Sequence, residues 1–177
     1  MNCIQYLSSS TEASVVSVTH EPFVPRSAPA DYVKNVDRRT DAKLELANGV
    51  TASLACDLGM PLTWGFIPKF PQIRVVVDCE LGYIDMFNFV MPTLYHSITV
   101  KIRGGHTRVE KVYKGHGEEW WSTYRYQLEA LVDRLRGRET KTWLSKEESV
   151  VVMEWIEQVY SKSGMGSRPR SSYIIST

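Results

Sequence analysis

Cysteines are few in this sequence, and nothing in their spacing would join them. Cys3, Cys56 and Cys79 are odd in number and show no C-x-x-C pattern, so we expect neither a disulfide framework nor a structural zinc site. No apolar run approaches the ~18 residues that span a bilayer, and the N-terminus lacks the basic and apolar regions of a signal peptide. We therefore expect a cytoplasmic protein without membrane contact.

An excess of charge of either sign is also missing. The 177 residues include 21 Lys and Arg against 20 Asp and Glu, which gives a net charge of +1. No overall field attracts a polyanion, so nucleic acid is not an expected partner. With 43% hydrophobic and 23% charged residues, the composition is that of one globular domain, which we place at residues 1–166, followed by a mobile tail at 167–177.

Glycine-rich phosphate loops are missing as well. A dinucleotide loop follows a strand and opens a helix, and a Walker loop adds a lysine. Here Gly104-Gly105 lies between two strand patterns, and Gly164-Met165-Gly166 follows a helical pattern. We therefore expect no nucleotide-binding half and no cofactor bound by this chain alone.

What is present is a series of hairpins followed by two helices. Residues 3–7 resemble the end of a helix without a cap, so we expect further sequence upstream, and the proline-rich residues 21–30 predict an extended loop. The strand patterns lie at 15–18, 40–56 (a hairpin), 73–78, 83–91, 98–102 and 109–113. This order predicts an α+β fold: an open, largely antiparallel sheet of about six strands with two or three helices packed on one face.

The hairpin around Asn48-Gly49 has a register that the apolar alternation decides. A three-residue loop pairs Leu44 with Ala52 and Ala42 with Leu54, which keeps one face apolar, whereas a two-residue loop does not. We therefore predict a three-residue loop with a left-handed Gly49.

The central strands are nearly continuous in apolar character at residues 75–77 and 86–91, which indicates cover on both faces. The few helices expected here cover one face. The other face should therefore meet a second subunit or another domain.

Both C-terminal helices have clear starts and apolar faces. The first begins near Ser122 or Thr123 and stops before Gly137, and the second has a capping box of Ser145 with Glu148 and ends before Gly164. The stripes that we expect to be buried are Leu128, Leu131, Val132 and Leu135 on the first helix, and Val152, Trp155, Ile156, Val159 and Tyr160 on the second.

Candidate chemical groups are scattered. The histidines lack the spacing of a metal site, so we expect solvated or hydrogen-bonded rings at His20, His96, His106 and His116. Glu118-Glu119 fits a helix dipole better than an acid–base pair.

Aromatic residues gather at the start of the first C-terminal helix. Trp120, Trp121, Tyr124 and Tyr126 suit a sugar or an aromatic ligand, and they suit packing or an interdomain contact as well. Of these two interpretations, we favour packing.

Several motifs in one order resemble a known family. The stretches WWSTYRYQLEA at residues 120–130, RGR at 136–138, WIEQVY at 155–160 and SG at 163–164 are similar to the C-terminal end of the Gfo/Idh/MocA (glucose-fructose oxidoreductase and inositol dehydrogenase) family. NFVMPTLYH at 88–96 resembles its fungal, xylose or dihydrodiol dehydrogenase-like branch.

The resemblance implies the C-terminal α+β domain without the N-terminal Rossmann domain that binds NAD or NADP in this family. The family's catalytic Lys in a Glu-Lys-Pro motif has no counterpart here, and Asn2 stands at the last position of its Gly-x-His-x-x-Asp motif. An amide orients a substrate but does not act as a base, so no catalytic residue is expected. The substrate-lining residues expected are Asn2, Trp64, Trp121, Tyr124 and Tyr126.

Three functions follow as hypotheses. The first is the substrate-side and oligomerisation domain of a sugar or dihydrodiol oxidoreductase, present as a truncated form or fragment that is inactive alone. The second is a scaffold or binding module that pairs with full-length relatives, and the third is half of a split enzyme. In each, the open sheet face contacts a second copy or a Rossmann-domain partner, and a sugar or diol is the ligand.

Overall fold

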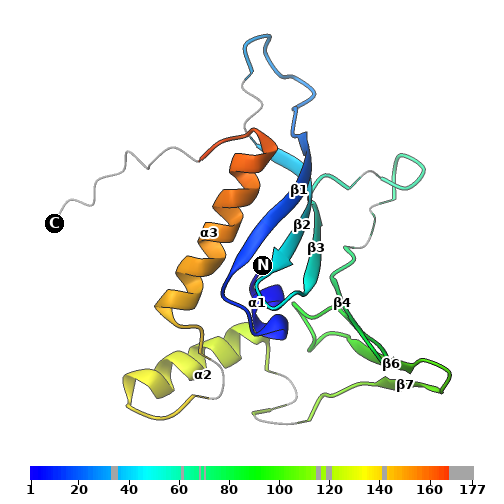
Figure 1. Cartoon of the computed structure of the whole chain (residues 1–177), viewed down its shortest axis with the longest axis vertical. Helices are drawn as coiled ribbons and strands as arrows, with labels where there is room; N and C mark the ends of the chain where they lie inside the picture. Colours follow the sequence, from blue (N-terminus) through cyan, green and yellow to red (C-terminus); the bar gives the residue numbers. More distant parts are fainter. Residues whose placement is uncertain are drawn as a thin grey trace. The chain divides into compact units, whose positions relative to one another are not determined.

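The computed structural model describes residues 1–32, 36–60, 62–67, 69, 71–114, 117–118, 121–140 and 143–167 (Figure 1). These residues form three helices and seven strands in two compact units, Met1–Lys69 with Leu144–Thr177, and Phe70–Trp143. The α+β class and the open antiparallel arrangement are confirmed, with the strands divided between two sheets. Of the predicted tail at 167–177, all but Ser167 lies outside the described residues, and a single domain over 1–166 stays a prediction.

The first unit is a three-stranded antiparallel sheet with a long helix on one face (Figure 1). The sheet order is β1-β2-β3. The helix α3 packs against β1. The elements of this unit are α1 (Asn2–Ser8), β1 (Ala13–Pro22), β2 (Asp37–Leu46), β3 (Thr51–Asp57) and α3 (Lys146–Ser163).

The β2–β3 hairpin has the predicted register. Leu44 pairs with Ala52 and Ala42 pairs with Leu54. Gly49 has a φ of 80°, a left-handed conformation that costs little only for glycine. The three-residue loop is thereby confirmed, because it keeps the apolar side chains of both strands on one face.

The core of this unit lies between α3 and that apolar face. Its buried members are Val15, Ala42, Leu44, Leu46, Trp155 and Val159. Val152, Trp155 and Val159 of the predicted stripe are buried, while Ile156 and Tyr160 are half-buried. Lys162 Nζ donates to the Val15 carbonyl at 2.6 Å, and Tyr160 OH donates to Asp37 Oδ1 at 3.2 Å. These two bonds tie the last turns of the helix to the sheet.

Caps and strand ends in this unit follow local chemistry. The capping box at Ser145 and Glu148 is present, and Gly164 is a left-handed C-cap. Accepting the backbone N–H of Ser145 lowers the pKa of Glu148.

The strand β1 runs through Pro22, so the expected loop at residues 21–30 begins two residues later than predicted. A proline is tolerated there because it stands at the end of an edge strand.

The second unit is a four-stranded antiparallel sheet in the order β4-β5-β6-β7, with one helix in the same unit. Three hairpin-type connections join neighbours along the chain, as predicted. The elements are β4 (Arg74–Cys79), β5 (Gly82–Phe87), β6 (Ser97–Ile102), β7 (Thr107–Glu110) and α2 (Thr123–Leu135).

The start of β5 depends on a glycine. Gly82 pairs with Ile102 across the sheet, and a Cβ on Gly82 would collide with the backbone carbonyl of Lys101. Two strands approach too closely there for any larger residue.

One strand is shorter than the apolar run suggests. We predicted a strand to residue 91, but β5 ends at Phe87. Asn88 has a φ of 56°, and its Nδ2 donates to the carbonyls of Met91 at 3.0 Å and Tyr95 at 2.7 Å. The asparagine amide therefore holds a turn in place of strand pairing.

The expected buried stripe on α2 is not buried. The helix begins after Ser122, whose Oγ accepts the Arg125 N–H, as predicted. Leu128 and Leu131 are nevertheless exposed and Leu135 is 79% exposed. The prediction was wrong because a helical stripe needs a packing partner, and sequence spacing alone does not supply one.

Candidate functional site

The aromatic residues at the start of α2 form a small cluster in the second unit. The rings of Trp121 and Tyr126 meet edge to face with centroids 5.4 Å apart. Gly117, with a φ of 81°, lies against both rings, and a Cβ there would overlap them. The cluster therefore rests on a glycine whose missing side chain leaves room for the indole.

Arg125 closes one side of this cluster. Its guanidinium carbon lies 5.1 Å from the centroid of the Trp121 ring, a cation–π arrangement. Arg125 also forms an ion pair with Glu129 at 2.6 Å, one turn later on α2. These contacts favour the packing interpretation for Trp121 and Tyr126, because both rings already have protein partners.

The other predicted substrate-lining residues lie elsewhere. Tyr124 is on α2 and is 76% exposed. Asn2 is the exposed first residue of α1, and Trp64 is 82% exposed at a left-handed φ of 53°. Asn2 and Trp64 belong to the first unit and the tyrosines and Trp121 to the second. Of the five residues, the structure thus brings Trp121 and Tyr126 into contact.

One histidine is buried and satisfied at both nitrogens. His96 Nδ1 lies 2.6 Å from the Pro92 carbonyl and donates to it, while Nε2 accepts the Val112 N–H at 2.8 Å. Its ring also stacks at a tilt on Tyr113, 4.6 Å between centroids. The expectation of a hydrogen-bonded histidine is confirmed for His96.

The remaining candidate residues form no chemical site in the described part of the chain. Trp120, Glu119 and His116 lie outside the described residues. Among the residues that the structure describes, no group of three His, Cys, Asp or Glu side chains is placed to hold a metal ion. Over the same ranges, no helix has both the length and the apolar character for a membrane crossing.

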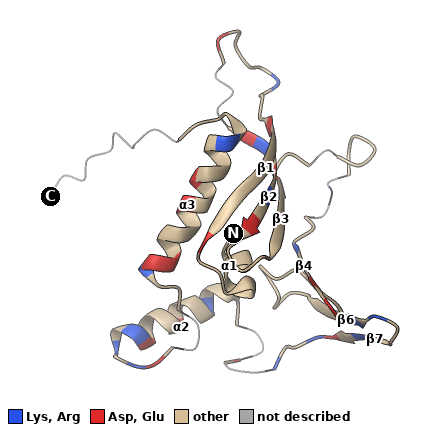
Figure 2. Cartoon of the chain, viewed as in Figure 1, with Lys and Arg blue, Asp and Glu red and all other residues tan. Residues whose placement is uncertain are grey.

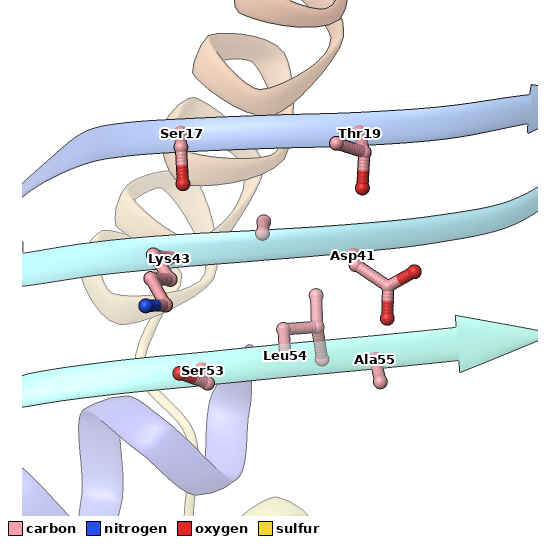
Figure 3. A pocket seen from close by; sticks show the side chains of 8 residues that line it. Ser17, Thr19, Asp41, Lys43, Ser53, Leu54 and Ala55 are labelled. Atoms are coloured by element: carbon pink, nitrogen blue, oxygen red, sulfur yellow. The ribbon is translucent and has the colours of Figure 1, made fainter.

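A shallow hollow lies on the open face of the three-stranded sheet, opposite α3, and sequence reasoning missed it. Its volume is about 350 Å³. Figure 3 shows Ser17 and Thr19 from β1, Asp41 and Lys43 from β2, and Ser53 from β3 along this face. The apolar open face expected from residues 75–77 and 86–91 concerns the strands of the second unit, and this face carries charged residues instead. The signal was present in the alternating charges of residues 39, 41, 43 and 45.

Two arginine–aspartate pairs organise charge on the sheets. Arg39 donates to both carboxylate oxygens of Asp41, at 2.7 and 3.2 Å, which raises the pKa of Arg39. In the other sheet, Arg74 makes the same forked contact with Asp85, at 2.6 Å from Nε, and lowers the pKa of the Asp85 carboxyl.

Charged residues of both signs are interspersed along the elements, and no single helix or strand carries a basic patch in the described ranges (Figure 2).

Comparison with known proteins gives a likeness of fold. No family model matches the chain, and no curated protein matches it in sequence. Solved structures do match. The aldose-aldose oxidoreductase of Caulobacter crescentus, complexed with glycerol, has a TM-score of 0.62 at 17% identity and is matched over 92% of this chain and 42% of its own.

Two further oxidoreductases have a similar fold. A putative oxidoreductase of Thermotoga maritima has a TM-score of 0.64 at 16% identity, over 92% of this chain and 42% of its own. The inositol dehydrogenase homolog of Azotobacter vinelandii, complexed with NAD+, has a TM-score of 0.61 at 14% identity. It is matched over 94% of this chain and 46% of its own. The fold is that of the C-terminal part of such oxidoreductases. This chain spans less than half the length of each.

Proposed function

We propose that this chain is the substrate-side and oligomerisation domain of an NAD(P)-dependent oxidoreductase of the Gfo/Idh/MocA family, acting on a sugar or a dihydrodiol. The observation that carries the proposal is the fold likeness over more than nine-tenths of this chain and less than half of each neighbour. The motifs at residues 120–130 and 155–160 support the same family, and those at 88–96 support its xylose dehydrogenase-like branch.

The proposed role is to bind and orient substrate. Oxidation of an alcohol carbon sends a hydride to the nicotinamide, which NAD or NADP supplies in the family, and a proton to a base. This sequence has no Glu-Lys-Pro lysine, and Asn2 carries an amide where the family has a carboxylate. We therefore assign no proton transfer to this chain and expect no turnover by it alone.

The substrate contact that we propose is aromatic. Rings with a polar edge suit the alternating C–H and O–H surface of a sugar or diol. The main contact that we propose is Tyr124, which is exposed on α2. Trp121 and Tyr126, whose rings already meet each other, are proposed as further lining. Asn2 and Trp64, the other residues expected to line a substrate, belong to the first unit, and their role stays a prediction.

The partner contact that we propose is the apolar face of the four-stranded sheet. Strand register places a set of apolar side chains on one face, namely Val75, Val77, Ile84, Met86, Ile98, Val100 and Ile102. Ile84 and Ile102 are exposed. A face of this kind suits a Rossmann-type domain or a second copy of the chain.

Calorimetric titration of the full chain with D-xylose and with a dihydrodiol tests the substrate role. We expect weak binding that Tyr124→Ala abolishes and that Tyr6→Ala, a matched exposed tyrosine on α1, leaves unchanged. Dehydrogenase turnover of either compound by the purified chain with NADP would refute the assignment. Equal loss of binding in both variants would remove Tyr124 from the site.

Co-purification and a turnover assay separate the scaffold module from the half of a split enzyme. A scaffold module would form mixed complexes with an intact relative and show no ligand binding, whereas half of a split enzyme would gain turnover when a separate Rossmann domain is added. The substrate-side role is supported only where ligand binding by this chain is also seen.

A further inference from the structure

The turn between β2 and β3 holds the end of α1 in place (Figure 1). Asn48 Nδ2 donates to the Ser8 carbonyl at 2.8 Å, and the Ala47 N–H donates to the Glu12 carbonyl at 3.1 Å. Ser8 is the last residue of α1, and the carbonyls of a final helical turn have no partner inside the helix. The Asn48 amide, 40 residues later in the sequence, therefore satisfies the end of α1.

The same side chain is folded back over the turn. Asn48 Oδ1 accepts the backbone N–H of Val50 at 3.2 Å, which closes an Asx turn. The ring of atoms closed by this hydrogen bond contains Asn48 Cγ and the backbone nitrogen of Gly49, so these two atoms are held near each other. Asn48 and Gly49 are exposed, and apart from chain neighbours no described atom lies within 4 Å of the point where a Cβ on Gly49 would stand. Water and hydroxide therefore have access to this amide.

We propose that Asn48 is a site of spontaneous deamidation, and that this modification releases α1 from the hairpin. The Gly49 nitrogen gives its proton to hydroxide and attacks Asn48 Cγ. The bond from Cγ to Nδ2 breaks, and ammonia leaves after taking a proton from water. Water then adds to either carbonyl carbon of the succinimide ring and opens it to aspartate or isoaspartate. The net change is hydrolysis of one amide to a carboxylate and ammonium, so water is the only reactant consumed.

The contacts of the turn both favour and slow this attack. Glycine has no Cβ to crowd its own nitrogen. The Val50 N–H that Oδ1 accepts is placed to stabilise the negative charge that develops on that oxygen. Against this, the Gly49 N–H donates to the Leu46 carbonyl at 2.9 Å, so the nitrogen loses its proton only when this hydrogen bond opens. We therefore expect a slow reaction that proceeds in the folded chain.

The product reverses the chemistry of the contact with α1. A carboxylate at position 48 has no N–H to donate, and its oxygens would face the carbonyl oxygen of Ser8. Negative charge is also unfavourable beside the C-terminal end of a helix. α1 has seven residues, too few for a stable helix by itself, and it would then be held mainly by Met1 and Ile4, which pack against the core. Deamidation should therefore let α1 open.

Peptide mapping by mass spectrometry tests the reaction on the full chain, incubated in mildly alkaline buffer. Asn48 should convert at least about tenfold faster than Asn88, which is followed by Phe89 and whose Oδ1 accepts the Met91 N–H instead. Asn48→Gln should abolish conversion at this position, because the longer side chain has to close a larger ring. Equal conversion of Asn48 and Asn88, or conversion of Asn48 only when the chain is unfolded in urea, would overturn the proposal.

Hydrogen exchange tests the release of α1 separately. Asn48→Asp reproduces one product, and Asn48→Ala removes the donor without adding charge. Amides of residues 5–8 should exchange at least about threefold faster in the alanine variant and about tenfold faster in the aspartate variant, while the Leu44 amide in the core keeps its rate. Gln158→Glu makes the same change from amide to carboxylate at an exposed position on α3 and should leave α1 unaffected. Circular dichroism of each variant confirms that the fold is retained.

The deamidated form of the unmodified chain should show the same exchange in α1 as Asn48→Asp. Unchanged exchange of residues 5–8 in both Asn48 variants would overturn the release of α1. Equal acceleration at residues 5–8 and at Leu44 would overturn it as well, because the whole first unit would then be loosened. These results are independent of the proposed redox role, since no cofactor or substrate takes part in the reaction or in the measurements.

Discussion

The two units use similar hairpins but differ in how much apolar surface they bury. Among the described residues, every buried hydrophobic side chain belongs to the first unit, where α3 covers one face of its sheet. The buried residues described in the second unit are Gly82 and His96. Its sheet has an apolar face and its helix has an apolar stripe, yet both leave large side chains exposed. The comparison teaches that antiparallel pairing alone does not make a core.

Truncation of one apolar side chain in each sheet gives the largest contrast. Leu44 is 0% exposed and Ile84 is 40% exposed. Leu44→Ala should lower the free energy of unfolding by about 2–5 kcal/mol, because it removes packed surface and leaves a cavity. Ile84→Ala should cost about 1 kcal/mol, since much of its surface is already in water.

Urea denaturation measures both changes. Equal losses of stability would mean that the two sheets are buried to the same degree, and the contrast between the units would then be broken. A larger loss for Ile84→Ala at high protein concentration alone would point to burial of that sheet in an oligomer.

His96→Ala sharpens the comparison inside the second unit. The substitution leaves the Val112 N–H and the Pro92 carbonyl without a buried partner, which should cost about 1–3 kcal/mol. Hydrogen exchange at the Val112 amide should accelerate. His106→Ala, at an exposed turn position, is the control, and similar exchange in both variants would show that His96 does not hold this segment.

Ser145→Ala tests the helix of the first unit. The serine Oγ accepts the Glu148 N–H at 3.1 Å, and the Glu148 carboxylate accepts the Ser145 N–H at 2.7 Å. Loss of the capping side chain should lower stability by about 1 kcal/mol. Ser161→Ala, an exposed serine near the other end of α3, should change it much less, and an equal effect would argue against the capping box.

The smallest effect is expected from the Arg74–Asp85 pair. Arg74 lowers the pKa of Asp85, so the pair stabilises the fold above the ordinary carboxyl pKa of about 3.9, and this contribution is lost as the pH falls through the lower, folded-state pKa. NMR titration of the Asp85 carboxyl carbon should show that low midpoint. Arg74→Gln should raise it, and an unchanged midpoint would mean that the arginine is not the cause.

Local features were predictable because their partners are close along the chain. The Gly49 turn, the Ser145 capping box and the Ser122 cap each depend on residues within four positions of one another. The end of β5 at Asn88 was equally local but was missed, because an apolar run concealed an asparagine that bonds to Met91 and Tyr95.

The candidate site was less predictable than the fold. Trp121 and Tyr126 are close in the sequence and their rings meet, but the contact of Gly117 with both rings depends on the loop conformation. The hollow beside Asp41 was missed because small side chains on three separate strands have to be aligned before it exists.

By itself, the sequence determined the element types, the register of the β2–β3 hairpin and the helix caps, because turns, alternation and caps are satisfied by neighbours a few residues away. Only the tertiary structure decided which apolar faces are buried. Burial requires a second surface, and the similar apolar stripes of α3 and α2 differ because the first meets a sheet face and the second stays largely exposed.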